Sequence, residues 1–194
     1  MEALNSLYRD HRTILQVLEA LEAFANSVET GTEDQREELA RFNTFFRDYV
    51  GLNHHDKEES VLMPVLEAHG FHWSDGALEK FREEHKHEDY LLRSLQQAAE
   101  RSGPWSGYER RSLGELLHQI VAFTRNHIKH ENVELLLAAI KRLPPDVLKE
   151  LDAALVRFRD EQMGADNEHA LLALAADLIE RHGAGSTSTE VPVP

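Results

Sequence analysis

Six polar side chains interrupt the apolar stripes of four segments that have a helical sequence pattern. In these segments apolar residues recur at steps of three and four, which predicts amphipathic helices. Each stripe places one histidine where an apolar residue is expected, and two stripes add a glutamate four residues later on the same face. The six residues are His11, His54, Glu58, His85, His127 and Glu131. Imidazole nitrogens and carboxylate oxygens are common metal ligands, so the pattern predicts a metal site between the helices.

A bound metal is the simplest compensation for burying this many polar groups. Burying two glutamates beside four histidines is unfavourable by roughly several kcal/mol for each unpaired ion. A single buried histidine is usually a hydrogen-bonded packing residue, but four at the same helical phase favour a shared site. The chain has no cysteine, which excludes disulfides, thiolate catalysis and cysteine-ligated zinc. Histidine and carboxylate without sulfur suit iron, and manganese or zinc fit less well.

The spacing of the histidines indicates an internal repeat. The two histidines are 43 residues apart in the first half of the chain (His11 and His54) and 42 in the second (His85 and His127). The stretch HHDKEESVLMP, which begins at His54, aligns without gaps on HIKHENVELLL, which begins at His127. Two such halves facing each other predict a site with pseudo-twofold symmetry. Two glutamates that can bridge favour two cations over one.

The elements that must position these residues are helices throughout the chain. Glycine and proline clusters divide it, and Pro64 is expected to kink or end the second helix. Ser74 or Asp75 is the expected N-cap of the third. Helices are predicted at about 3–28, 33–68, 75–101, from about 107 to 143, 146–163 and from about 168 to 182. The fold class is therefore all-α: an antiparallel up-down four-helix bundle over 1–143, an extra C-terminal helical pair over 144–182 on the same domain, and a disordered tail over 183–194.

Composition limits the partners of the protein. The 194 residues include 21 Lys and Arg against 35 Asp and Glu, so the net charge is −14. This sign disfavours binding to nucleic acid or to an anionic membrane surface. No apolar run approaches the ~20 residues of a membrane-spanning helix, and the acidic, amphipathic N-terminus is unlike a secretory signal. We expect a cytoplasmic protein with a small-molecule ligand, and no protein partner is indicated.

Several of these motifs together resemble the hemerythrin-like, or HHE cation-binding, family over residues 1–143. The matching pieces are Tyr8-Arg9-Asp10-His11-Arg12, His54-x-x-Lys57-Glu58-Glu59 leading to Leu62-Met63-Pro64, Glu84-His85, and His127-Ile128-Lys129-x-Glu131-Asn132. The resemblance implies two non-haem iron ions with an oxo or hydroxo bridge, the four histidines as terminal ligands and both glutamates as bridges. It further implies binding of dioxygen, peroxide or nitric oxide, in sensing, storage or iron handling.

The chain departs from the oxygen-carrying members of that family in two places. Four residues after His85 stands Asp89 instead of a second histidine, and the last motif is HxxxE instead of HxxxxD. Fewer histidines leave more open ligand positions, which disfavours a long-lived oxygen adduct and favours sensing or peroxide reactivity. A di-iron enzyme that decomposes peroxide is therefore the alternative function. A zinc-binding or metal-free helical scaffold is the second alternative.

The sequence leaves some metal-ligand assignments open. His55 and Glu59 form a second HxxxE motif shifted by one residue, but they lie on a weaker apolar stripe than the one through His54. Asp89 and Glu88 both lie near the face that His85 occupies, so either is a candidate for an additional ligand.

Other candidates lie further from the apolar stripes. Glu161 and His169 belong to the C-terminal pair, which either covers apolar surface or brings one of them to the metals. Ferritin-like di-iron proteins use Glu-x-x-His pairs. Here such pairs lie off the stripes and are predicted to be on the surface: Glu84–His87 and Glu115–His118. Exposure is also expected for His69, His72 and His182.

Overall fold

The computed structural model describes residues 4–71 and 77–183, and its described residues are helical apart from short connections. The elements are α1 (Asn5–Thr30), α2 (Arg36–Thr44), η1 (Phe45–His55), η2 (Glu58–Leu62), α3 (Met63–Ala68), α4 (Ala77–Glu100), α5 (Gly107–His130), η4 (Glu131–Leu136), α6 (Leu137–Arg142), α7 (Pro145–Gln162) and α8 (Ala165–His182). The all-α prediction is confirmed. The expectations for His72, Ser74, Asp75 and the tail from 184 onward lie outside the described residues.

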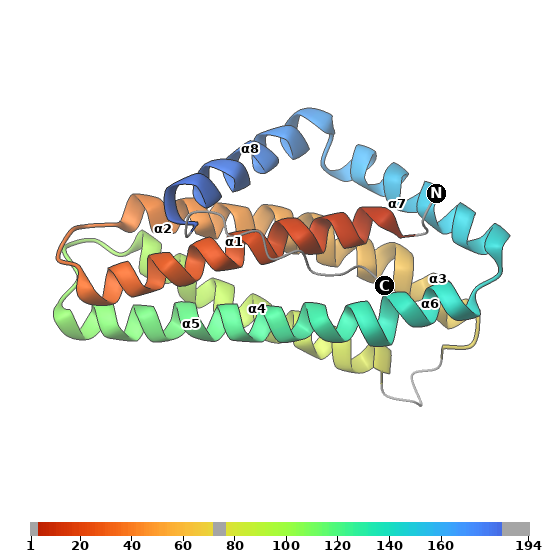
Figure 1. Ribbon diagram of the computed structural model, residues 1–194, viewed down its shortest axis with the longest axis horizontal. Coiled ribbons are helices and arrows are strands. Elements are labelled where there is room, and N and C mark those ends of the chain that lie inside the picture. The colour runs from red at the N-terminus through yellow and green to blue at the C-terminus, as the bar shows by residue number, and fades with distance from the viewer. Residues whose placement is uncertain (1–3, 72–76, 184–194) are drawn as a thin grey trace.

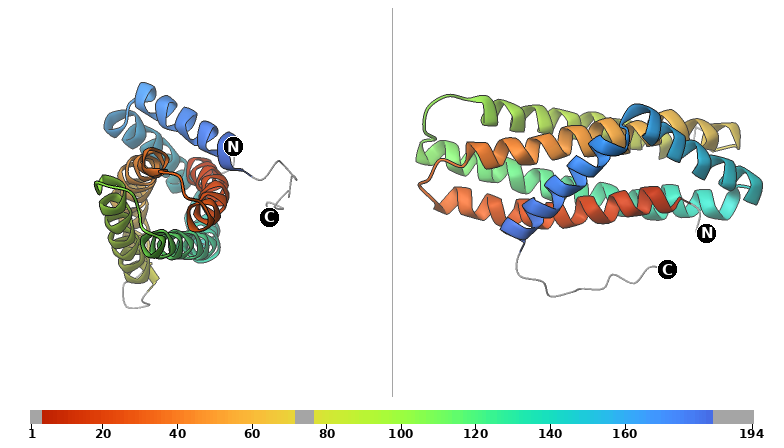
Figure 2. Two further views of the ribbon diagram at one scale, coloured as in Figure 1. Left: turned by 90° about the vertical axis from the view of Figure 1, so that its left-hand side faces the viewer. Right: turned by 90° about the horizontal axis from the view of Figure 1, so that it is seen from above.

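Four long helical runs lie side by side around one axis. They are α1, the run from α2 to α3, α4, and the run from α5 to α6, and consecutive runs are joined at opposite ends (Figure 1). The end-on view shows these four runs as a ring, with α7 and α8 outside it (Figure 2). This arrangement brings residues from all four runs to one axis.

Local sequence accounts for where the helices begin and end. Ser106 caps α5: its hydroxyl accepts from the backbone N–H of Glu109, and the Glu109 carboxylate accepts from the backbone N–H of Ser106. Pro145 begins α7 at a position where a missing N–H leaves no hydrogen bond unmade. Gly164 joins α7 to α8 with a φ of 73°, a conformation that side chains with a Cβ rarely adopt.

The buried core consists of two apolar clusters. One cluster contains Ile14, Val50 and Leu92, and the other contains Leu7, Leu62 and Leu135. Each buried leucine or isoleucine contributes roughly 1.5–3 kcal/mol to folding. On α1, His11 lies between Leu7 of one cluster and Ile14 of the other. A polar layer therefore separates the two clusters.

The helices widen at this layer. The segments η1, η2 and η4 have π-helical hydrogen bonding, whereas the sequence pattern predicted uninterrupted α-helices. Segments of π-helix are found frequently at functional sites. Pro64, expected to kink or end the second run, lies in the first turn of α3 instead, where it has no N–H to give to the preceding turn.

The C-terminal pair packs on the α1 and α2 side of the ring. Seen from above, α8 crosses α1 and the second run diagonally (Figure 2), and Leu155 and Leu178 are buried. Arg41 Nη2 lies 2.5 Å from Asp177 Oδ2. His182, expected to be exposed, is half-buried: its ring lies 5.3 Å from that of Phe24.

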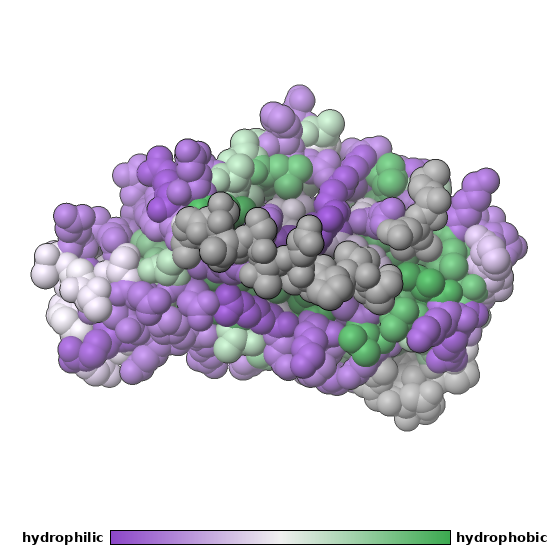
Figure 3. Space-filling view, in the orientation of Figure 1, coloured by the Kyte–Doolittle hydropathy of each residue, from purple (hydrophilic) through white to green (hydrophobic). Residues whose placement is uncertain are grey.

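Most of the face seen in Figure 3 is hydrophilic, in keeping with the charge of the chain. No helix in the described ranges has both the length and the apolar content that crossing a bilayer requires.

Candidate metal centre

All six predicted ligand residues lie in the polar layer. Each is at most 4 % exposed, and they come from α1, η1, η2, α4, α5 and η4. The sequence stripes therefore predicted their common burial. Whether they hold a metal is decided by how their nitrogen and oxygen atoms are arranged.

The first group of donor atoms joins His11 and His54 to the two glutamates. Nε2 of His11 and Nε2 of His54 lie 3.0 Å apart. Glu131 Oε2 lies 3.2 Å from Nε2 of His11. Glu58 Oε2 lies 3.9 Å from Nε2 of His54. One nitrogen or oxygen atom from each of these four residues lies within 4.8 Å of the others, a separation at which one cation could contact all four.

The second group joins His85 and His127 to the same two glutamates. Nε2 of His85 lies 3.5 Å from Glu58 Oε2 and 3.4 Å from Glu131 Oε1. Nε2 of His127 lies 3.0 Å from Glu131 Oε1. These four residues meet the same 4.8 Å limit. Glu58 and Glu131 belong to both groups, which is the arrangement that two bridging carboxylates require.

Buried oxygen atoms in this layer lack hydrogen bonds. Both carboxylate oxygens of Glu58 and Oε2 of Glu131 are buried without a hydrogen-bond partner among the described residues. Leaving a buried acceptor unpaired is unfavourable by about 1–3 kcal/mol, and by more for a charged one. Cations bound between the groups would satisfy these atoms, so the donor set fits a metal centre.

The imidazoles share one orientation. The Nε2 atoms lie in the centre, and each Nδ1 lies toward an oxygen on a neighbouring helix. Three of the imidazoles donate a hydrogen bond through Nδ1: His11 to Asn132 Oδ1 (2.8 Å), His85 to Glu59 Oε1 (2.7 Å) and His127 to Glu84 Oε2 (2.8 Å). The fourth, His54, has its Nδ1 3.7 Å from Asp10 Oδ2. An acceptor at Nδ1 leaves the Nε2 lone pair free for a metal and holds the ring in place.

These outer oxygens follow the internal repeat. In the aligned halves Asn132 corresponds to Glu59, and Glu84 corresponds to Asp10. The pseudo-twofold relation read from the spacing therefore extends from the ligands to the residues that orient them.

Charge in the layer is balanced by the histidines in the metal-free protein. Burial lowers the pKa of His85, but its hydrogen bond to Glu131 and the nearby Glu58 carboxylate outweigh burial and raise that pKa to about 12. Burial also opposes the charge on His127, and the Glu131 carboxylate raises its pKa to about 10. Burial raises the pKa of Glu131, yet the surrounding imidazoles hold it well below its usual range. In the metal-free protein, the protonated imidazoles of His85 and His127 thus supply the positive charge that a bound metal would supply.

Comparison with protein families supports this centre. The family model described as the hemerythrin HHE cation-binding domain matches residues 2–139. The chain belongs to this family. The matched range contains all six candidate ligands of this HHE domain. Comparison with curated proteins and with solved structures gives no significant match.

A buried charge network lies behind His54 in the HHE domain. Lys57 Nζ donates to Asp10 Oδ2, and the Tyr49 hydroxyl donates to Asp10 Oδ1 over 3.0 Å. Burial raises the pKa of Asp10, but His54 and Lys57 hold it well below its usual range. Burial together with the charge of Asp10 raises the pKa of Tyr49. Asp10 therefore stays ionised with its charge compensated locally.

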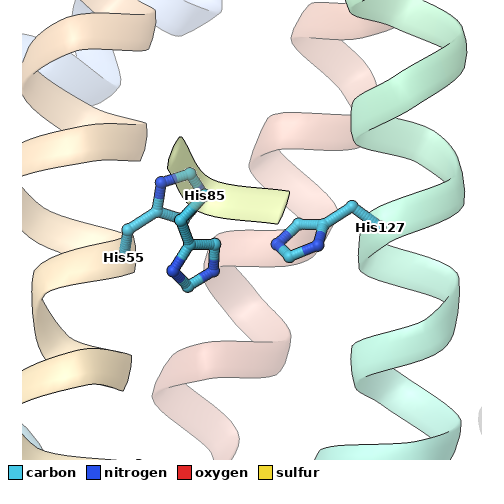
Figure 4. Close-up of side chains that lie close together, drawn as sticks. All are labelled: His55, His85 and His127. Carbon is cyan, nitrogen blue, oxygen red and sulfur yellow. The ribbon is translucent and has the colours of Figure 1, made fainter. Parts of the chain in front are cut away.

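Three further candidate ligands near His85, namely His55, Glu88 and Asp89, differ in their burial and contacts. His55 is buried, and its ring stacks on that of His85 with centroids 4.0 Å apart (Figure 4). Glu88 is fully buried, and its Oε1 accepts from the Thr124 hydroxyl at 2.5 Å. The Asp89 side chain is 61 % exposed and pairs with Arg93, so it does not reach the centre. Its carboxylate turns to solvent and to Arg93, whereas Glu88, one residue earlier, is buried beside His55.

The remaining candidates lie away from the centre of the HHE domain. Glu161 and His169 are exposed on α7 and α8, so neither reaches the six residues. Of the ferritin-like pairs, Glu115 and His87 are exposed and His118 is half-buried, while Glu84 contacts His127 instead of His87. His69 is exposed as expected.

Two features of the site were not predicted from the apolar stripes. The first is the burial of His55 beside His54, because adjacent residues on an α-helix point about 100° apart. The π-helical winding of η1 accompanies the burial of both. The second is the set of Nδ1 acceptors, which lie beside the ligands in sequence but contact histidines of other helices.

Proposed function

We propose that this HHE domain is a non-haem di-iron protein that binds dioxygen or a related small oxidant. The supporting observation is the pair of buried donor groups that share both carboxylates. In this proposal His11 and His54 hold one iron, His85 and His127 hold the other, and Glu58 and Glu131 bridge them. When bound, the two irons supply reversible electron transfer to and from the ligand.

The residues of the chain perform the positioning. Glu58 and Glu131 bring negative charge to a layer that has an apolar cluster on either side, and these clusters lower the local dielectric and strengthen electrostatic interactions. The Nδ1 acceptors fix the tautomer in which Nε2 is free to bind metal. Sensing, storage or iron handling are the roles that such a centre supports.

A peroxide-decomposing enzyme is the second candidate. It is favoured by the exposure of Asp89, because α4 then supplies a single imidazole to the centre. A position with fewer protein ligands is more open to a reacting molecule. Steady turnover of hydrogen peroxide, faster than that by free iron, distinguishes this enzyme from a binding protein.

The architecture that goes with this function is part of the proposal. We take α1 to α6 as an antiparallel up-down four-helix bundle and the α7–α8 pair as an addition to the same domain. The ion pair between Arg41 and Asp177 and the burial of Leu155 and Leu178 support a single folding unit.

Metal analysis of protein purified without added metal tests the function. The expected result is two irons per chain, with near-ultraviolet absorption that disappears on reduction under nitrogen and returns in air. The His118→Ala variant is the matched control, since His118 lies outside the donor groups, and it should keep both irons. Zinc in place of iron, or no metal, would reject the di-iron proposal and leave a scaffold.

A further inference from the structure

The two halves of the centre differ in polarity at a pair of buried, pseudo-equivalent positions. In the gapless alignment of the HxxxE stretches, His55 corresponds to Ile128. When His85 is aligned on His11, Glu88 corresponds to Ile14. All of these side chains are buried. The half that contains His85 therefore has a polar pair where the half that contains His11 has two isoleucines.

The polar pair has an unused hydrogen-bond acceptor. Nε2 of His55 lies 3.5 Å from Glu88 Oε2, while Glu88 Oε1 accepts from Thr124. Glu88 Oε2 is buried and has no hydrogen-bond partner among the described residues. This oxygen is an acceptor that a donor on a bound molecule would satisfy.

The stacking of His55 on His85 argues against a shared cation. Their ring planes are 14° apart with centroids at 4.0 Å. A ligating imidazole holds its metal in the ring plane, about 2 Å from the nitrogen. One nitrogen from each of His55, His85 and His127 lies within 4.8 Å of the others, so these three form a third group of possible ligands. Two nearly parallel rings at this separation, however, do not both direct a nitrogen at one cation in their own ring planes. His55 lies beside His85 (Figure 4), so a small molecule bound next to a cation on His85 would lie near His55.

A pocket leads to this place from the surface. It has a volume of about 320 Å³, and His55 and His85 line it together with Gly51, Leu52 and Asp89, which lie on η1 and α4. Leu52 is 59 % exposed, so the pocket opens to solvent. On the pseudo-equivalent side, α1 packs closely along α5. The pocket thus connects solvent with the half of the centre that has the polar pair.

We infer that the small ligand enters through the pocket between η1 and α4 and binds beside His55 and Glu88, on the His85 side of the centre. The position at which the ligand binds rests on the proposed function, because it requires bound iron. The route through the pocket does not, because it depends only on the residues of the chain. The pseudo-symmetric side, closed by Ile14 and Ile128, takes no ligand.

Cysteine accessibility tests the route without any metal. The chain has no cysteine, so His55→Cys and Ile128→Cys each introduce a single thiol at equivalent positions. In the metal-free protein, methyl methanethiosulfonate should modify the His55→Cys thiol at least about tenfold faster than the Ile128→Cys thiol. Gly51→Phe should slow the modification of His55→Cys, since a Cβ on Gly51 has room and its side chain would fill the pocket.

Azide binding to the iron-loaded protein tests the ligand position. Gly51→Phe should slow azide association at least about tenfold in stopped-flow absorbance. Gly107→Phe, a glycine with similar room away from the pocket, should leave the rate unchanged. His55→Ile and Glu88→Ile should keep both irons and shift the absorption maximum of the azide complex, whereas Ile14→Val should not shift it.

The outcomes separate the two proposals. Equal modification of the two thiols, or an azide rate unaffected by Gly51→Phe, overturns the route even if the protein holds two irons. Loss of iron in His55→Ile or Glu88→Ile overturns the ligand position, because these residues would then be metal ligands. A metal-free wild-type protein rejects the proposed function and the ligand position with it, while the thiol rates still decide the route.

Discussion

Glu131 and His11 come from the last and the first of the four long helical runs, and Oε2 of Glu131 lies 3.2 Å from Nε2 of His11. The other oxygen of the same carboxylate lies 3.0 Å from Nε2 of His127. One side chain therefore contacts imidazoles from both halves of the chain. Removal of its charge should disturb both donor groups at once.

Glu131→Gln should reduce the iron content below two per chain. The amide keeps the size of the side chain but loses the negative charge that balances the imidazoles and bridges the two groups. The affinity for iron should fall by more than the roughly 10–100-fold typical of an outer-shell change. Metal analysis after dialysis measures this. Glu134→Gln, an exposed glutamate on the same segment, is the control and should behave as wild type. Two irons retained in Glu131→Gln would show that Glu131 is not a bridge.

Glu84→Leu should weaken iron binding without removing a ligand. Glu84 accepts a hydrogen bond from Nδ1 of His127, and loss of such an acceptor lowers metal affinity by roughly 10–100-fold. Glu84→Gln should restore most of the affinity, because the amide oxygen of Asn132 already serves His11 in the same way. Competition with a chelator gives the affinities.

Glu83→Leu is the matched control for that series. Glu83 is exposed and pairs with Lys86, so the variant should bind iron as the wild type does. Equal affinities for Glu84→Leu and Glu83→Leu would contradict an orienting role for Glu84.

The apolar stripes predicted the six central residues because each lies three or four residues from its neighbours on the stripe. That logic depends on the α-helical period, and it fails where the winding changes. Asp89 and Glu88 illustrate the limit: both lie near the face of His85, yet Glu88 is fully buried and Asp89 is exposed. A difference of one residue turns the side chain by about 100°, which a coarse stripe does not resolve.

The contacts between helices were beyond the sequence pattern for a different reason. His182 packs against Phe24 and Glu38 because α8 crosses the long helices diagonally, and periodicity within α8 contains no information on that crossing. Glu59 reaches His85 in the same manner, from another helix. Such pairings depend on the relative placement of helices, so the structure was needed to find them.

Metal binding should release protons and strengthen as the pH rises. In the metal-free protein the carboxylates raise the pKa of His127 to about 10 and that of His85 to about 12, so both imidazoles hold a proton at neutral pH. A metal must displace these protons. Titration of the metal-free protein with Fe²⁺ in weakly buffered solution containing a pH indicator should show acidification. An affinity independent of pH between 6 and 8 would contradict this prediction.

The same shifts set the stability of the metal-free protein. A histidine whose folded-state pKa is raised contributes stability that is fully present below its unfolded pKa of about 6.5. This contribution is lost as the pH rises through the folded values of about 10 and about 12. Urea unfolding of the metal-free protein should therefore become easier between about pH 7 and pH 10. The iron-loaded protein should not show this loss, since the metal replaces the protons.

Lys57→Met should destabilise the fold by about 3–5 kcal/mol, because it leaves the buried carboxylate of Asp10 without its cation. Lys57 is 1 % exposed and Asp10 is fully buried, so water does not compensate for the loss. The free energy of unfolding in urea measures the effect. Lys86→Met removes an exposed ion pair with Glu83, which solvent screens, and should leave the stability close to that of the wild type.

The double variant Asp10→Asn with Lys57→Met separates an unpaired charge from lost packing. Without the carboxylate there is no buried charge to compensate, so the double variant should be more stable than Lys57→Met alone. Equal instability of the single and double variants would mean that Lys57 stabilises the fold through the packing of its aliphatic chain, and that Asp10 does not need it as a counter-ion.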